Sequence, residues 1–93
     1  MSQQDTFTSK LVAIDDDPAA LELIRAALKQ QPLEVLTTVD PEAGLELVLH
    51  QRPQIVLLDL MMPKISGMEL LERIVEAAPE TEVVLLTGDY STD

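Results

Sequence analysis

The stretch that decides the fold is IVLLDLMMPKISG, residues 55–67. Its apolar residues do not alternate with polar ones, a pattern typical of a strand buried on both faces between parallel neighbours. This strand, predicted over residues 54–60, contains one charged residue, Asp59, near its end. Pro63 and Gly67 follow closely and indicate that the chain turns there towards the next element. A segment suited to the centre of a parallel sheet therefore carries a carboxylate at its exit.

Strands and helices are predicted to alternate on both sides of this stretch. Short apolar or β-branched runs predict strands at residues 11–14, 34–39 and 82–87. Helices are predicted from residue 18 to the proline at 32, from 41 to about 53, and from 67 to 78. Asp17, Asp40 and Ser66 are their expected N-caps. The expected inner faces are Ala20, Ile24, Ala27 and Leu28 in the first helix, and Leu71, Ile74, Val75 and Ala78 in the third.

This alternation predicts an α/β fold, a doubly wound parallel sheet with right-handed crossovers and helices on both faces. The connections are short and no repeat or linker is visible, so we expect one domain over residues 10–93. The polar residues 1–9 are interpreted as a disordered N-terminal lead-in, without the basic-then-apolar layout of a signal peptide.

Composition limits the classes of partner. The formal net charge of −11 disfavours direct binding to nucleic acid and suits cations or basic protein surfaces. There is no cysteine, so a disulfide framework or thiolate metal site is excluded. No apolar run approaches a membrane span. We therefore expect a cytoplasmic location and no membrane contact.

Acidic side chains follow two of the predicted strands. Asp15 and Asp16 come just after residues 11–14, Asp59 ends the apolar run, and Thr87 ends the last strand. If the strands that precede Asp15 and Asp59 are neighbours, these groups meet at one edge of the sheet, where ligands of open parallel sheets bind. Close carboxylates favour a hard cation, and Mg²⁺ needs few protein oxygens and leaves places for phosphate. A carboxylate beside Mg²⁺ can become an aspartyl phosphate.

At these residues the chain resembles the receiver domain of two-component response regulators. LVAIDDDP is similar to the first strand and acidic pair of that family, IVLLDLMMPKISGMELL to its phosphorylation strand, loop and third helix, and VVLLTG to its fourth strand. The resemblance spans about residues 10–87. It implies the flavodoxin-like fold with strand order 2-1-3-4. The ending TGDYST further resembles receivers of sigma-54-dependent transcription activators.

The resemblance implies a role for each candidate residue. Asp59 is the expected phosphoacceptor for a histidine kinase or phosphotransfer protein. Asp16 and Asp59 are expected to bind Mg²⁺ directly, Asp15 mainly through water, and Met61 through its backbone carbonyl. Thr87 is the expected switch hydroxyl, which contacts the phosphoryl group. Pro63 and Gly67 are expected to shape the loop after Asp59. The chain is then a self-phosphorylating switch for an output domain rather than a turnover enzyme.

The family pattern continues with a helix, a strand that ends in lysine and a last helix, which do not occur in this sequence. We therefore interpret residues 10–93 as an incomplete receiver domain, truncated after the fourth strand. We therefore expect an exposed edge at residues 82–87 and exposed side chains at Leu21, Ile24 and Leu28. Such a piece is expected either to be marginally stable alone or to form a homodimer through the sheet edge or a helix face.

Two alternatives stay open. A degenerate receiver could serve only for dimerisation or docking, which the missing lysine element favours and the acid triad opposes. A nucleotide or flavin binder of the same fold is disfavoured, because no glycine-rich loop follows residues 11–14.

Overall fold

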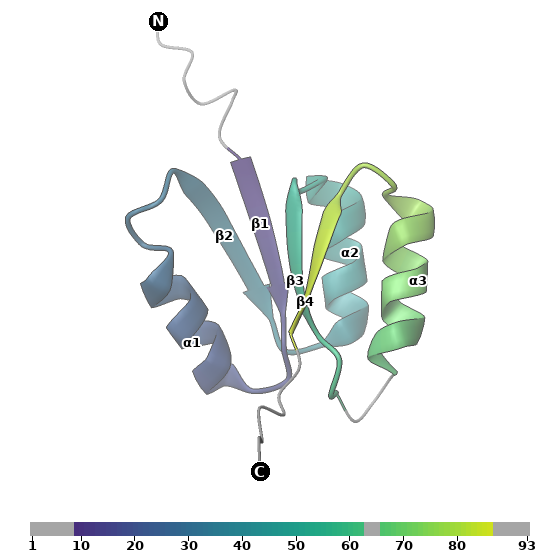
Figure 1. Cartoon of the computed structure of the whole chain (residues 1–93), viewed down its shortest axis with the longest axis horizontal. Helices are drawn as coiled ribbons and strands as arrows, with labels where there is room; N and C mark the ends of the chain where they lie inside the picture. The colour runs from purple at the N-terminus through teal and green to yellow at the C-terminus, as the bar shows by residue number, and fades with distance from the viewer. Residues whose placement is uncertain (1–8, 63–65, 87–93) are drawn as a thin grey trace, which may run out of the picture.

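Strands and helices alternate along the described part of the chain, and the strands form one parallel sheet (Figure 1). The computed structural model describes residues 9–62 and 66–86. The sheet order β2-β1-β3-β4 confirms the predicted α/β doubly wound class and the order 2-1-3-4. The elements are β1 (Ser9–Ile14), α1 (Pro18–Ala27), β2 (Leu33–Thr38), α2 (Pro41–Gln51), β3 (Ile55–Asp59), α3 (Gly67–Ala77) and β4 (Glu82–Leu86).

Helices cover the two faces of the sheet unequally. The larger core lies between the sheet and the pair α2 and α3, whereas α1 packs on the opposite face over β1 and β2. The larger core is entirely aliphatic apart from one methionine, as the near absence of aromatic residues requires. Its buried residues are Val12, Ile14, Val48, Val56, Leu58, Met62, Leu70 and Ile74.

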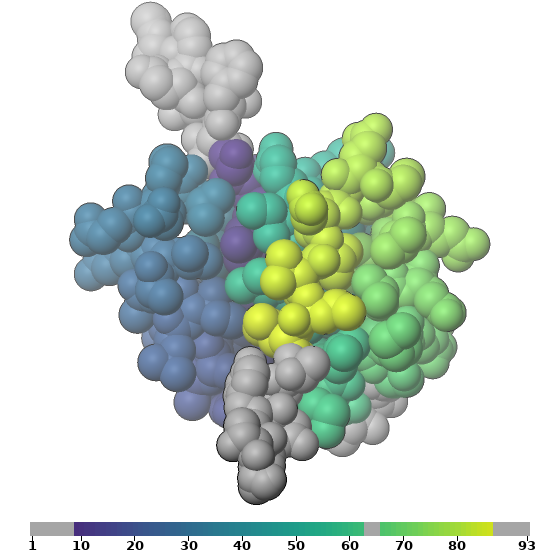
Figure 2. All heavy atoms as spheres, in the orientation of Figure 1, coloured from purple at the N-terminus to yellow at the C-terminus, as the bar shows by residue number. Residues whose placement is uncertain are grey.

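This unequal cover decides how far β3 is buried. Val56 and Leu58 have no exposed surface on the side of α2 and α3. Ile55 and Leu57 are only half-buried, because α1 lies over β1 and β2 rather than over β3. The prediction of burial on both faces is thus confirmed on one face and met in part on the other. At the next strand, Val84 and Leu85 are 43% and 40% exposed, and Figure 2 shows β4 open at the surface.

All the predicted N-caps are confirmed. The side chains of Asp17, Asp40 and Ser66 each accept a hydrogen bond from a backbone N–H two or three residues further on. In α1 and α2 a proline follows at the first helical position, where its missing N–H costs nothing. β1 begins at Ser9, the last residue of the predicted lead-in, and residues 1–8 lie outside the described part of the chain.

The predicted end of α1 at Pro32 is wrong. The helix ends at Ala27, and the next residues form turns. The N–H of Lys29 bonds to the carbonyl of Ala26 at 3.3 Å, three residues back, and the N–H of Gln31 bonds to that of Leu28 at 3.0 Å. The chain must reverse direction before β2 begins. The change from helical bonds to these tighter three-residue turns therefore starts several residues before Pro32, which restricts the backbone of Gln31.

The predicted inner faces are partly wrong. Leu21, expected to be exposed, is only 6% exposed and packs with Leu11 and Ala13, whereas Ala27 is exposed. In α3, Leu70 is buried and Val75 is exposed, although Val75 was expected to face inward. Residues three or four apart share a helix face, but that spacing does not say which of two overlapping apolar stripes meets the sheet.

Candidate functional site

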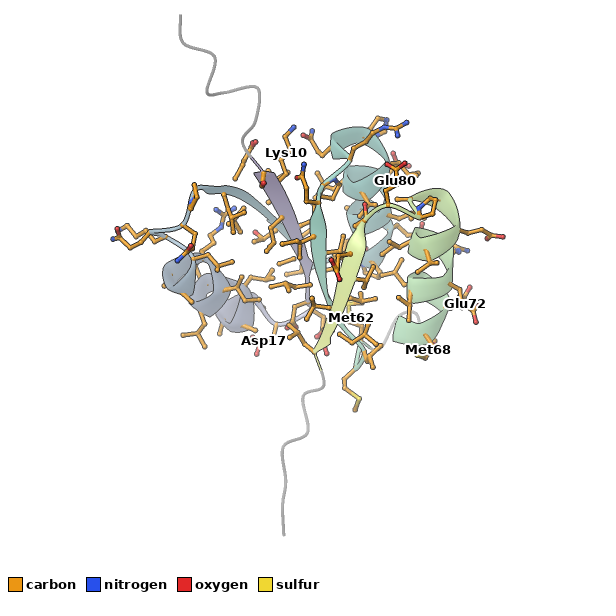
Figure 3. All side chains as sticks on the ribbon, turned by 45° about the horizontal axis from the view of Figure 1, so that its top comes forward. Lys10, Asp17, Met62, Met68, Glu72 and Glu80 are labelled. Atoms are coloured by element: carbon orange, nitrogen blue, oxygen red, sulfur yellow. The ribbon has the colours of Figure 1, made fainter. Side chains whose placement is uncertain are left out.

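Acidic side chains converge where β1 and β3 end. Asp15 follows β1, and Asp59 is the last residue of β3; the register pairs Ile14 with Leu58 just before them. One carboxylate oxygen from each of Asp15, Asp16 and Asp59 lies within 4.8 Å of the others. Figure 3 shows Asp17 and Met62, the labelled neighbours of this cluster, at one end of the sheet and Lys10 and Glu80 at the other. The acid cluster predicted from the sequence is therefore present.

Local hydrogen bonds hold the two buried carboxylates. The Oδ1 atom of Asp15 accepts from the N–H of Asp17 at 3.0 Å, and Oδ1 of Asp59 accepts from the N–H of Met61 at 3.0 Å. Each carboxylate thereby closes an Asx-type turn that takes the chain out of its strand. The N–H of Leu60 donates to the carbonyl of Leu86 at 3.2 Å, which fixes the start of the loop after Asp59 to β4.

Burial and mutual repulsion dominate the electrostatics of the cluster. Asp15 and Asp59 are each 7% exposed, whereas Asp16 is exposed. The pKa of Asp15 is raised to about 6, mainly by burial and also by a hydrogen bond with Asp59 and by the charges of Asp59 and Asp16. The hydrogen bond from the N–H of Asp17 opposes this rise in pKa. The site therefore favours either a proton or a cation.

A single small cation fits this donor set. Oxygens on opposite sides of one Mg²⁺ are about 4 Å apart, twice the usual bond length of roughly 2.1 Å. The separations of up to 4.8 Å therefore need only a small inward rotation of the carboxylates. Asp15 and Asp16 also occupy the turn after β1, where a nucleotide-binding protein of this architecture carries its phosphate loop, and this argues against the nucleotide-binding alternative.

Replacing Asp15 with asparagine is expected to remove a pH dependence of stability. The pKa of Asp15 is raised from 3.8 to about 6 in the folded chain, so its contribution to stability is fully present below pH 3.8 and is lost as pH rises through about 6. This loss amounts to at most about 3 kcal/mol. Without metal, the variant should be the more stable protein at neutral pH, with the difference vanishing towards pH 4.

Urea unfolding at several pH values in the presence of a chelator measures this difference. Glu76→Gln, which removes an exposed acid on α3, is the control and should keep the pH dependence of the wild type. Parallel pH curves for the wild type and Asp15→Asn would contradict the prediction.

The other predicted site residues are described unevenly. Met61 is exposed, and its N–H supports Asp59. Thr87 and Pro63 lie outside the described residues, although Leu86, just before Thr87, pairs with Asp59 in the sheet. Gly67 contributes by close packing: a Cβ there would lie 2.5 Å from Cα of Leu60. The close packing of Gly67 was not predicted from the sequence. The N–H donors of Asp17 and Met61 were not predicted either, although an Asp just after a strand commonly accepts such a bond from the N–H two residues on.

Comparison with known proteins identifies one family. The family model described as "Response regulator receiver domain" matches residues 11–93. The transcriptional regulatory protein DltR of Streptococcus agalactiae is 36% identical over 83 residues, which are 89% of this chain and 37% of DltR. The DNA-binding response regulator MtrA of Mycolicibacterium smegmatis is 31% identical over 88 residues, 95% of this chain and 38% of MtrA. The chain thus spans under two fifths of these relatives.

Solved structures have the same fold. A CheY-like receiver domain from Methanospirillum hungatei superposes with a TM-score of 0.83 at 26% identity, covering 89% of this chain and 66% of that one. The response regulator TrrA of Thermotoga maritima, solved in complex with Mg²⁺-BeF, gives 0.81 at 28% identity, covering 88% and 71%.

Proposed function

The chain belongs to the response regulator receiver domain family, and from this premise we propose that it is a magnesium-dependent switch phosphorylated on Asp59. The observation that carries the proposal is the convergence of Asp15, Asp16 and Asp59 at the carboxyl end of β1 and β3. Among these, Asp59 is the last residue of β3. Its side chain closes the turn that follows, and its backbone pairs with Leu86 of the edge strand β4. A conformational change there can reach the β4 edge.

The proposed donor is a phosphohistidine of a histidine kinase or phosphotransfer protein. A carboxylate oxygen of Asp59 attacks phosphorus, the P–N bond to the donor breaks, and the imidazole leaves with the electron pair and takes up a proton. Asp59 then carries an acyl phosphate. Asp16, Asp59 and the Met61 carbonyl would hold Mg²⁺, with Asp15 acting mainly through water, and the bound ion would supply positive charge for the phosphoryl oxygens.

The remaining protein groups have supporting roles in this proposal. The N–H of Met61 holds one Asp59 oxygen, which leaves the other free to react. The burial of Asp15 and Asp59 excludes bulk water from part of the cluster and strengthens its electrostatic interactions. Thr87 keeps the role implied by the resemblance, a hydroxyl that bonds to the phosphoryl group.

We further propose a cytoplasmic transcription regulator as the full context. The relatives DltR and MtrA are named as a transcriptional regulatory protein and a DNA-binding response regulator. With a net charge of −11, this piece does not itself contact nucleic acid in the proposal. Among the described residues, no helix has the length and apolarity to cross a membrane. Membership of the sigma-54-dependent class stays a prediction.

Incubation with acetyl phosphate and Mg²⁺ tests the proposed phosphorylation. The expected result is a single phosphate mass increment that peptide mapping places on Asp59 and that a chelator prevents. No increment in the presence of Mg²⁺, from a chain that is folded by circular dichroism, would contradict the proposal and support the docking-only alternative. An increment on another residue would contradict the assignment of Asp59.

A further inference from the structure

A groove of about 420 Å³ lies between α1 and β2, at the opposite edge of the sheet from β4. Its floor consists of the half-buried apolar residues Leu28, Leu33 and Val35, and its rim carries Glu22, Arg25 and Lys29. Figure 1 shows β2 as the outermost strand on this side, with α1 next to it. We propose that two copies of this chain associate here as an antiparallel, two-fold symmetric dimer.

The charge distribution favours a second copy at this place. The whole chain has only 6 lysines and arginines against 17 acidic residues, so most approaches between copies are repulsive. Arg25 and Lys29, two of those six cations, lie on the rim of this one groove. A second acidic chain therefore meets less repulsion here than at the surface of α3, where Glu72 and Glu76 flank the apolar Leu71 and Val75.

The groove is also complementary to itself. Glu22 lies near one end of its helical rim, and Lys29 lies in the turn that follows α1 at the other end. A two-fold axis reverses the order of the rim, so Glu22 of each copy comes to face Lys29 of the other. Arg25 of each copy then faces Ala26 of the other copy, a small residue that also lines the groove. The two Arg25 side chains therefore do not face each other. Such self-complementarity is what an isologous interface requires.

The backbone of β2 supplies the second component of the interface. Among the described strands, β2 pairs only with β1, so its outer N–H and C=O groups have no strand partner there. Antiparallel pairing of β2 with β2 of the second copy joins the two sheets and places both α1 helices on the same face. The second copy then covers the apolar side chains of the groove floor. The acid cluster, between β1 and β3, stays accessible in both copies.

Charge reversal at the rim tests the proposal. Sedimentation velocity over a concentration series of the 93-residue chain should show a monomer–dimer equilibrium that salt weakens. Lys29→Glu should weaken dimerisation by roughly tenfold or more, because two facing pairs become repulsive. The double variant Glu22→Lys with Lys29→Glu restores opposite charges and should restore the dimer.

Arg52→Glu is the matched control. It makes the same charge change at the exposed end of α2 and should leave dimerisation unchanged. A chain that is monomeric at every concentration would overturn the proposal. Equal dimerisation of Lys29→Glu and the wild type would also overturn it. The same holds if Val84→Lys, on β4, dissociates the dimer and Lys29→Glu does not. Circular dichroism melts verify that each of these exposed-site variants is folded.

Discussion

Asp59→Asn is expected to reduce phosphate incorporation from acetyl phosphate to background while making the metal-free protein more stable. The asparagine oxygen can still accept the N–H of Met61, so the turn after β3 is retained. The amide cannot form the acyl phosphate that is proposed for the carboxylate. Removing the charge of Asp59 also removes its repulsion of the Asp15 carboxylate, a repulsion that raises the pKa of Asp15. The metal-free variant should therefore be more stable than the wild type at neutral pH.

A matched variant separates loss of the reactive group from a general disturbance of the acidic loop. Asp17→Asn changes an acid close to the cluster but keeps a side chain that can cap α1. Its phosphorylation should stay near that of the wild type. Intact-mass measurements on both variants, with thermal melts in a chelator, give the two readouts. Phosphate incorporation by Asp59→Asn at the rate of the wild type would contradict the assignment of Asp59 as phosphoacceptor.

The acid cluster was predictable because it follows from topology rather than from fine packing. Parallel strands place their carboxyl ends at one edge, so an acid after each of two strands meets its counterpart once those strands are neighbours. The residues alone left that neighbour relation open, and the resemblance supplied it through the strand order. The register of Ile14 with Leu58 then brings Asp15 and Asp59 together. The raised pKa of Asp15 could not be predicted from the sequence, because it depends mainly on burial, which sequence spacing does not reveal.

All the predicted strands and helices are present, but the predicted end of α1 and the predicted inner helix faces were partly wrong. At these places tertiary packing decides between choices that the sequence makes nearly equivalent. The run that contains Leu21, Ile24 and Ala27 supports more than one apolar stripe, and contact with Leu11 and Ala13 selects the stripe that contains Leu21. The end of α1 was predicted from Pro32, yet the reversal towards β2 ends the helix at Ala27. Capping, by contrast, depends on residues close in sequence, and each predicted cap was confirmed.

Gly67 shows a second limit of prediction from sequence. A glycine after Pro63 indicates a turn, but Gly67 is the first residue of α3 and does not have a positive φ angle. Its role is to let α3 approach the chain just after Asp59: a Cβ would lie 2.5 Å from Cα and 2.8 Å from the carbonyl oxygen of Leu60. The absence of a side chain is thus required by a neighbour seven residues earlier in the sequence, which no local pattern reveals.

Gly67→Ala is therefore expected to destabilise the fold by about 2 kcal/mol or more and to weaken Mg²⁺ binding and phosphorylation. The clashing atoms belong to the backbone of Leu60, whose N–H is bonded to β4, so they cannot rotate away. Either α3 must move outward or the segment from Asp59 to Met61 must shift, and that segment carries the proposed ligands. Urea unfolding gives the stability change, and the acetyl phosphate reaction at several Mg²⁺ concentrations gives the change at the site.

Gly44→Ala is the matched control for this prediction. Its new Cβ would be about as close to its nearest neighbour as the Cβ at residue 67, but that neighbour is a side chain rather than the backbone. It would lie 2.6 Å from Cδ1 and 2.8 Å from Cγ1 of Ile14, side-chain atoms that can move at the cost of local repacking. Within α2, alanine also gains up to about 1 kcal/mol in helix propensity over glycine, which offsets part of that cost. The net loss should therefore be smaller than for Gly67→Ala, with Mg²⁺ dependence unchanged. Equal losses at both positions would contradict the view that the backbone of Leu60 makes Gly67 indispensable.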